Sequence, residues 1–234
     1  MNQQQPIGIF DSGMGGLTVA HAVSKMLPNE QLIYFGDSAH LPYGDKSAAT
    51  IQAYSIKICD ILLEKGCKVI LIACNSASAA AYELIKAYVG SKALVMNVID
   101  PVVNYVVKTH SNEKVGLIGT KQTVGSGVYD YQIKAQDQSI QVGALATPLL
   151  VPMIEEGFHK NEISEAIIKE YLSDNALSEI KALILGCTHY PLIKNKVSEF
   201  YKGKTDVIDS SEIVASALKE LLNTHQLLAQ KRSK

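Results

Sequence analysis

Short apolar runs alternate with segments of helical periodicity along most of this chain. The runs are rich in β-branched residues and lie at positions 7–10, 32–35, 69–73, 115–118 and 182–185. After the second run, apolar residues keep a three-to-four-residue spacing from Ile51 to Leu62, and the pattern stops before Gly66, a common helix end. Parallel strands need crossover helices of this kind, so the alternation predicts an α/β fold with mostly parallel sheets.

Two distant segments of the chain resemble each other. Val-Ile-Leu-Ile-Ala-Cys-Asn-Ser begins at Val69, and Ala-Leu-Ile-Leu-Gly-Cys-Thr-His begins at Ala182. Each predicts a strand buried on both faces that delivers a cysteine and two polar residues to the loop after it. Ligands bind beyond the carboxyl ends of parallel strands. We therefore predict two similar lobes that face each other across a central cleft and contribute one cysteine each.

The order of the predicted elements also suggests where the lobes begin and end. The first lobe is expected to contain residues 1–97 and 209–234, and the second residues 98–208. A strand and crossover at 206–210 are expected to return the chain to the first lobe, on which a helix then packs. The tail 226–234 is polar and is expected to fray.

The charge balance excludes several classes of function. The 234 residues include 22 basic and 23 acidic side chains, a formal net charge of −1, which supplies no broad field for nucleic acid or an anionic membrane. No apolar run approaches the roughly 18 residues of a membrane span, and the polar start, residues 1–6, has no signal pattern. We expect a cytoplasmic protein with a small-molecule substrate and no nucleic-acid or membrane partner.

Four cysteines are spread over the chain without a C-x-x-C pair. This spacing is typical of free thiols and predicts neither a disulfide framework nor a metal site. Cys59 in a helix and Cys67 at the start of a strand are expected to be small buried hydrophobic residues. Cys74 and Cys187 can also be core residues, but their matched positions at strand ends favour a shared function. His189 strengthens this interpretation, because an imidazole can share or remove a thiol proton near neutral pH.

Two loops in the first half of the chain have both a structural and a functional interpretation. The glycine-rich turn 11–16 can bind an anion at a helix N-terminus, whereas Asp11 and Ser12 can equally act as helix caps. The turn Pro42-Tyr43-Gly44 either covers its loop or holds backbone groups toward a ligand. Both loops are therefore candidates for binding a small molecule.

Polar residues in the second half have the same ambiguity. Thr120 and Thr123 follow a strand and a glycine, where a hydroxyl caps the next helix or binds a carboxylate. Glu155 and Glu156 are by default solvated helix residues. Position alone does not decide between these roles.

Several distinctive motifs are spread along the chain. They are Gly8-Ile-Phe-Asp-Ser-Gly-Met-Gly-Gly-Leu-Thr, Tyr34-Phe-Gly-Asp-Ser, Pro42-Tyr-Gly, Ala73-Cys-Asn-Ser-Ala-Ser, Gly119-Thr and Leu185-Gly-Cys-Thr-His-Tyr-Pro. Together they resemble the glutamate racemase family over nearly the whole chain. The resemblance implies two facing α/β lobes with an amino acid between them. It also implies a cofactor-independent, homodimeric isomerase that supplies D-glutamate for bacterial peptidoglycan, and so for cell wall biogenesis and cell shape.

The resemblance also implies roles for individual residues. Cys74 and Cys187 match two catalytic cysteines. Asp11 matches the carboxylate beside the first cysteine, and His189 matches the imidazole beside the second. Glu155 matches an auxiliary carboxylate, although the alignment can shift to Glu156. The positions that match substrate contacts are Asp11, Ser12, Pro42, Tyr43, Gly44, Asn75, Ser76, Thr120, Thr123, Thr188 and His189.

The chain departs from the usual family pattern at a few positions. Ser38 and Ser76 stand where threonine is expected, and Asn97-Val-Ile-Asp-Pro replaces a more usual Gly-Val-Ile-Glu-Pro. These changes retain hydroxyls and charge. A missing methyl group alters binding by only about 1 kcal/mol, so the choice between strict glutamate specificity and a broader amino-acid range stays open.

Two thiols suit the inversion of an α-carbon on chemical grounds alone. The reaction needs a base on one face of the carbon and an acid on the other, each about 3–3.5 Å away, and two lobes can supply them. A free thiol with a pKa near 8.5 is only about 3% thiolate at pH 7, so Asp11 and His189 are candidates to assist deprotonation. Hydroxyl and backbone donors beside the cysteines are expected to stabilise the carbanion through the substrate carboxylate.

Two other classes of function remain open. A cysteine-nucleophile hydrolase would use Cys187 with His189, but it leaves Cys74 without a role. A non-catalytic amino-acid-binding relative would keep the cleft without turnover, and the presence of both cysteines argues against it.

Overall fold

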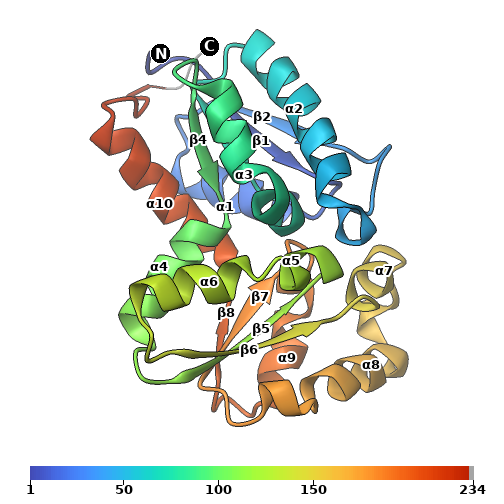
Figure 1. The fold of residues 1–234 in the computed structure, drawn as a ribbon. Helices are drawn as coiled ribbons and strands as arrows, with labels where there is room; N and C mark the ends of the chain where they lie inside the picture. Colours follow the sequence, from blue (N-terminus) through green and yellow to red (C-terminus); the bar gives the residue numbers. More distant parts are fainter. Residues whose placement is uncertain (232–234) are drawn as a thin grey trace.

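The computed structural model describes residues 1–231 and contains two α/β lobes, each built on a four-stranded parallel sheet (Figure 1). The first sheet has the order β2 (Leu32–Gly36), β1 (Ile7–Asp11), β3 (Val69–Ile72), β4 (Leu94–Asn97). The second has the order β6 (Gln141–Ala146), β5 (Lys114–Gly119), β7 (Ala182–Gly186), β8 (Asp206–Ile208). All six strand pairings are parallel. The predicted fold class is confirmed.

Helices connect successive strands and cover the sheets on both faces. They are α1 (Leu17–Met26), α2 (Ala48–Glu64), α3 (Asn75–Val89), α4 (Ile99–Thr109), α5 (Lys121–Gly125), α6 (Val128–Gln136), α7 (Leu150–Glu155), α8 (Glu162–Leu172), α9 (Lys194–Phe200) and α10 (Ser210–Thr224). Single 3-10 turns lie at η1 (Tyr43–Asp45), η2 (Phe158–Lys160), η3 (Asn175–Leu177) and η4 (Tyr190–Ile193). Within the described residues, no helix combines the length and apolar character needed to cross a membrane.

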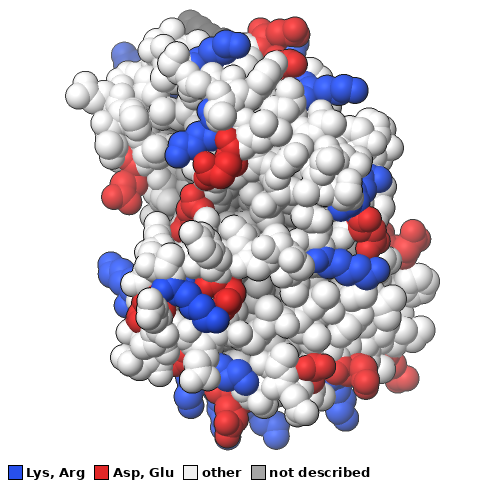
Figure 2. All heavy atoms as spheres, viewed as in Figure 1, with Lys and Arg blue, Asp and Glu red and all other residues white. Residues whose placement is uncertain are grey.

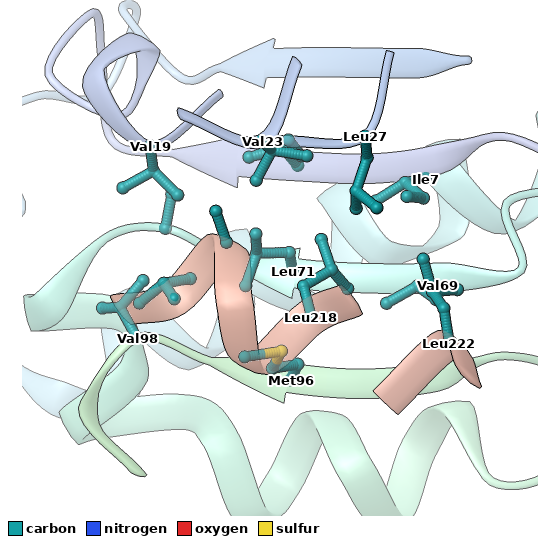
Figure 3. Close-up of a cluster of buried hydrophobic side chains, with 14 of the residues drawn as sticks. Ile7, Val19, Val23, Leu27, Val69, Leu71, Met96, Val98, Leu218 and Leu222 are labelled. Carbon is teal, nitrogen blue, oxygen red and sulfur yellow. The ribbon is translucent and has the colours of Figure 1, made fainter. Parts of the chain in front are cut away.

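Each sheet has an apolar core on both faces because its central strands are buried at nearly every position. In the first lobe, the side chains of β3 alternate: Val69 and Leu71 point to one face, Ile70 and Ile72 to the other. Figure 3 shows the first of these two cores. It is formed by the sheet residues Ile7, Val69, Leu71 and Met96, the α1 residues Val19 and Val23, and the α10 residues Leu218 and Leu222.

The last helix belongs to the first lobe although the chain reaches it from the second. Helix α10 follows β8, crosses between the lobes and packs its apolar face on the core beside α1 (Figure 1). This agrees with the expectation that a helix after 206–210 packs on the first lobe. The precise lobe boundaries, at 97/98 and 208/209, stay a prediction.

A buried ion pair ties both ends of the chain to the first lobe. The Lys68 ammonium lies 2.6 Å from a carboxylate oxygen of Glu30, and both side chains are almost fully buried. Lys68 Nζ also donates to the carbonyl oxygens of Gln3 (2.7 Å) and Leu227 (2.9 Å), and the Ala229 backbone N–H donates to Glu30 (2.8 Å). The expectation that the tail frays is therefore wrong for residues 227–229, because Leu227 and Ala229 are buried and hydrogen-bonded. Residues 232–234 lie outside the described part.

Candidate active site

The strand order places two central strands of each lobe at the cleft. In each sheet the connection reverses direction between the first and third strands, and ligands bind at the carboxyl ends of strands around such a point. Phe10 pairs with Ile72 in the first lobe, and Gly119 pairs with Gly186 in the second. The residues just beyond these pairs include Asp11 and Cys74 in one lobe, and Thr120 and Cys187 in the other.

A cavity of about 220 Å³ lies between these strand ends. Twelve of the fourteen site residues predicted from the sequence line it: Ser12, Pro42, Tyr43, Gly44, Cys74, Asn75, Ser76, Thr120, Glu155, Cys187, Thr188 and His189. The other two, Asp11 and Thr123, are buried directly behind it and bond to residues of its wall. The fold thus brings all fourteen together.

Cys74 precedes α3 and contributes its thiol from the first lobe. The thiol donates to the Ser12 hydroxyl at 3.7 Å. Burial raises the pKa of Cys74 to about 12, and the nearby Asp11 carboxylate adds to the rise. The Ala77 backbone N–H and the Ser12 hydroxyl oppose it by stabilising the thiolate. The resting state of Cys74 is therefore a neutral thiol.

Cys187 contributes the thiol of the second lobe and is backed by an imidazole and a carboxylate. Its Sγ lies 3.6 Å from His189 Nδ1, and His189 Nε2 lies 2.9 Å from a Glu155 oxygen. Burial is the main cause that raises the pKa of Cys187, which the His189 backbone N–H partly opposes. Of the two candidate carboxylates, Glu155 therefore contacts the imidazole, while Glu156 lines the cavity without such a contact.

Asp11 holds the loop between β1 and α1 instead of capping the helix. One carboxylate oxygen accepts from the Gly13 backbone N–H at 3.1 Å, and the other receives a long hydrogen bond of 3.4 Å from the Thr188 hydroxyl of the opposite lobe. The residue preceding α1 is Gly16, with no side-chain cap. The capping interpretation of Asp11 and Ser12 is therefore wrong.

A line of hydroxyls joins the two lobes across the cavity. The Ser76 and Thr120 hydroxyl oxygens lie 2.8 Å apart, and Thr123 Oγ1 is 3.1 Å from Thr120 Oγ1. Thr120 also caps α5 by accepting from the Thr123 backbone N–H. The capping interpretation of Thr120 is thus confirmed, and the same residue lines the cavity. That its hydroxyl binds a carboxylate stays a prediction.

The turn after β2 forms part of the cavity wall. Tyr43 is buried, and its hydroxyl donates to the Asp37 carboxylate at 2.6 Å, which anchors the turn. A side chain at Gly44 would place its Cβ 2.7 Å from the Thr120 Cβ, so glycine is required for this close approach between the lobes. The Tyr43 hydroxyl anchors the turn, and Pro42, Tyr43 and Gly44 line the cavity.

Sequence reasoning missed part of the wall. The segment from Thr147 to Pro152 follows β6 and supplies Thr147, Pro148, Val151 and Pro152, while Leu41, Asp45, Lys121 and Gly186 complete the lining. Thr147 is buried and its hydroxyl lies 2.6 Å from the Tyr190 hydroxyl. Its position directly after a strand would have marked it, had β6 been recognised. That strand has exposed positions and an internal glycine, which weaken its apolar pattern.

The high thiol pKa gives a direct test of the site's resting state. At a pH well below both pKa values, a thiol with a pKa of about 12 has a thiolate fraction about a thousandfold smaller than a thiol with the ordinary pKa of 9.0. We expect iodoacetamide to alkylate Cys74 about a thousandfold more slowly than glutathione at pH 8. The rate should rise about tenfold per pH unit from pH 7 to 10, because the thiolate fraction grows with pH. Peptide mass mapping measures it, and a plateau below pH 9 would contradict this assignment.

The chain thus has two similar α/β lobes, and each contributes a thiol to one cavity between them. These features define a class of two-lobed proteins with a site between similar halves. A family model described as Asp/Glu/Hydantoin racemase matches residues 17–218. A glutamate racemase of Chlorobaculum parvum is 41% identical over 225 residues, covering 96% of this chain and 82% of the relative. The chain belongs to this racemase family, among its glutamate racemases, and is therefore an isomerase.

Solved structures agree with this placement. A crystal structure of glutamate racemase from Francisella tularensis in complex with D-glutamate has a TM-score of 0.92 at 40% identity, covering 98% of this chain and 85% of that one. The glutamate racemase isoform RacE1 of Bacillus anthracis has a TM-score of 0.94 at 30% identity, with 98% and 86% covered. The resemblance noted in the motifs is thus confirmed over nearly the whole chain.

Proposed function

We propose that this protein interconverts L- and D-glutamate by proton transfer at the α-carbon, with Cys74 and Cys187 as the two acid–base groups. The observation that carries the proposal is that the two thiols come from different lobes and line one cavity. The bound D-glutamate of the Francisella tularensis relative supports the choice of substrate. The cavity volume of about 220 Å³ suits a small amino acid.

In the proposed reaction the two thiols account for both proton transfers. One cysteine, as thiolate, takes the α-proton and leaves a carbanion. The other, as thiol, donates a proton to the opposite face of the carbon. After one turnover the thiol and thiolate have exchanged places, and the same pair can run the reaction in reverse. The starting form returns when the first cysteine loses its new proton to solvent and the second takes one up from solvent.

The first thiolate has to form against the effect of burial. Both resting thiols are neutral, because burial raises the pKa of Cys74 and Cys187. On the second-lobe side, His189 is within reach to accept the Cys187 proton, and Glu155 stabilises the imidazolium that results. The positively charged ammonium group of a bound amino acid would favour a thiolate in the same cavity.

The carbanion is stabilised by donors that face the cavity. The Ser76, Thr120 and Thr188 hydroxyls and the Asn75 amide surround the space between the thiols. Hydrogen bonds to the substrate carboxylate strengthen as negative charge moves onto it from the α-carbon. Because these donors belong to both lobes, the site is complete only while the two lobes face each other in this arrangement.

Several wider parts of the proposal rest on the family resemblance. We propose that the D-glutamate formed supplies peptidoglycan synthesis in the cytoplasm, and that the protein acts as a homodimer. The proposed reaction assigns every proton transfer to the chain's own side chains and gives no role to a cofactor. Among residues 1–231, no group of three His, Cys, Asp or Glu side chains is arranged to hold a metal ion.

One arrangement also suits a second reaction. The Cys187–His189–Glu155 array has the order of a thiol nucleophile, a base and an orienting carboxylate, as in a cysteine hydrolase. Such an enzyme would lose its activity when Cys187 is replaced and keep it when Cys74 is replaced. Racemisation requires both cysteines, so single replacements separate the two functions.

The proposal is tested by incubating L-glutamate with the purified, reduced protein and following optical rotation. Decay of the rotation to zero, with equal amounts of L- and D-glutamate by chiral chromatography, is the expected result. A rotation that persists while D-glutamate binds would indicate a non-catalytic relative. Aspartate, run in parallel, tests how strictly the protein selects its amino acid.

Adjacent glutamates offer a matched pair for testing the second-lobe acid–base array. We expect Glu155→Gln to lower kcat/KM about tenfold or more, because a neutral amide stabilises the His189 imidazolium less than a carboxylate does. Glu156→Gln should stay within about twofold of the wild type, since Glu156 makes no contact with His189. Steady-state racemisation kinetics measure both. Equal losses in the two variants would remove Glu155 from the array.

A further inference from the structure

The Asn75 side chain is buried at the cleft with half of its hydrogen-bonding capacity unused. Asn75 is the first residue of α3, lines the cavity and is 3% exposed. Its amide nitrogen has no hydrogen-bond partner among the described residues. A buried amide N–H₂ without a partner carries a free-energy cost that a bound ligand can remove. This orphan group therefore indicates a ligand acceptor.

The amide oxygen of Asn75 has a partner in the opposite lobe. The Tyr129 hydroxyl, from α6, donates to Asn75 Oδ1 at 2.7 Å, and Tyr129 is 1% exposed. Burial and the Asp100 carboxylate raise the pKa of Tyr129, so its hydroxyl remains a proton donor over the whole working range of pH. The Tyr129 hydroxyl has no other acceptor among the described residues, so its buried proton is paired only while the amide oxygen of Asn75 faces it. Tyr129 thus selects one of the two orientations of the amide.

We propose that Tyr129 is a positioning residue that holds the Asn75 amide with its N–H₂ group facing the cavity, ready to donate to an oxyanion of the substrate. The identity of that oxyanion as a glutamate carboxylate rests on the proposed function. Without the tyrosine hydroxyl, the amide is free to turn its oxygen toward the substrate, where it would repel a carboxylate. Tyr129 and Asn75 belong to different lobes. The orientation of the Asn75 amide is therefore fixed only while the two lobes keep this arrangement.

The position of Tyr129 separates its two parts cleanly. Its ring packs in the second-lobe core with Ile99, Val102 and Ile133, while the hydroxyl reaches Asn75. Tyr129→Phe therefore retains the core and removes the positioning hydrogen bond. Tyr201→Phe is the matched control: it also removes a buried second-lobe tyrosine hydroxyl, one without a hydrogen-bond partner in the described part of the chain.

Binding and kinetics of four proteins test the proposal: Tyr129→Phe, Asn75→Ala, the double variant and Tyr201→Phe. We expect Tyr129→Phe to raise both KM and the Kd for D-glutamate about tenfold, with the Kd measured by calorimetry. A tenfold loss of affinity is the effect expected from losing one or two hydrogen bonds. The double variant should bind no more weakly than Asn75→Ala alone, because the hydroxyl acts through the amide. Tyr201→Phe should match the wild type. Losses that add in the double variant, or an unchanged Kd in Tyr129→Phe, would overturn the proposal.

A readout that needs no substrate keeps this test apart from that of the proposed function. In the wild type, the side-chain N–H₂ protons of Asn75 should give one sharp pair of NMR signals, because a single orientation is held. In Tyr129→Phe the pair should broaden or shift, while Tyr201→Phe leaves it unchanged. If glutamate is not racemised, the proposed function fails, but this signal still decides the role of Tyr129. An identical Asn75 signal in Tyr129→Phe would refute the positioning role.

Discussion

Replacing either cleft cysteine by alanine will lower the rate of glutamate racemisation at least about a thousandfold in both directions. Each thiol serves one face of the α-carbon, and one positioned acid or base contributes about 10²–10⁴-fold. Among the described residues, no other thiol lines the cavity. The remaining donors still bind the amino acid, so the Kd for D-glutamate should change only a few fold.

The control for this experiment is a cysteine outside the cavity. Cys59 lies in α2 within the first-lobe core and is buried, and Cys59→Ala should keep the wild-type turnover. The rates are measured by circular dichroism starting from each enantiomer. A Cys74→Ala variant that retains most of its activity while Cys187→Ala is inactive would refute the two-thiol reaction and favour the hydrolase interpretation.

Replacing Lys68 by methionine will strongly lower the free energy of unfolding. Lys68→Met leaves the Glu30 carboxylate buried without its counter-charge and leaves two backbone carbonyls without a donor. Breaking a buried ion pair in this way costs about 3–5 kcal/mol, which corresponds to a Tm lower by about 10 °C for a chain of this size. The pair lies at the amino end of the sheet, far from the cleft, so KM at low temperature should not change.

A double variant distinguishes loss of the pair from loss of packing. In Lys68→Met/Glu30→Leu no charge is left buried, so part of the lost stability should return. The backbone groups of Leu227 and Ala229 that the pair holds remain unsatisfied, which prevents full recovery. Thermal unfolding followed by circular dichroism gives both values. Equal Tm values for Lys68→Met and the wild type would contradict a stabilising role of the Lys68–Glu30 ion pair.

Sequence reasoning predicted most of the fold because the central strands are buried on both faces. Their uninterrupted apolar runs, such as 69–73, are visible without any other information, and parallel pairing follows from the helices between them. The edge strands β4 and β6 were not predicted. They are short or partly exposed, and β6 contains Gly143, so neither has a continuous apolar pattern.

The site residues beside the strand ends could be predicted for the same reason, since the fold gathers such residues at one place. The cysteines, Asp11 and Thr188 were found by position and by family resemblance. What the sequence could not supply were the contacts between lobes. The bond from Tyr129 to Asn75 joins residues 54 positions apart, and no local pattern marks it.

Charge placement also follows the expectation from composition. Basic and acidic side chains are interspersed over the face shown in Figure 2, without a continuous patch of one sign on that face. The residues that carry the proposed chemistry are mostly uncharged thiols, hydroxyls and amides within the cavity.

The most direct test of the two-thiol reaction is the fate of the α-proton in deuterated water during the first few per cent of turnover. With L-glutamate as substrate, the D-glutamate formed should carry deuterium at the α-carbon, while the remaining L-glutamate keeps protium. This follows because one thiol removes the proton and a different, solvent-exchanged thiol supplies its replacement. Proton NMR and mass spectrometry of the separated enantiomers give both contents. D-glutamate that retains its original proton would show that a single group moves it from face to face, and would contradict the account.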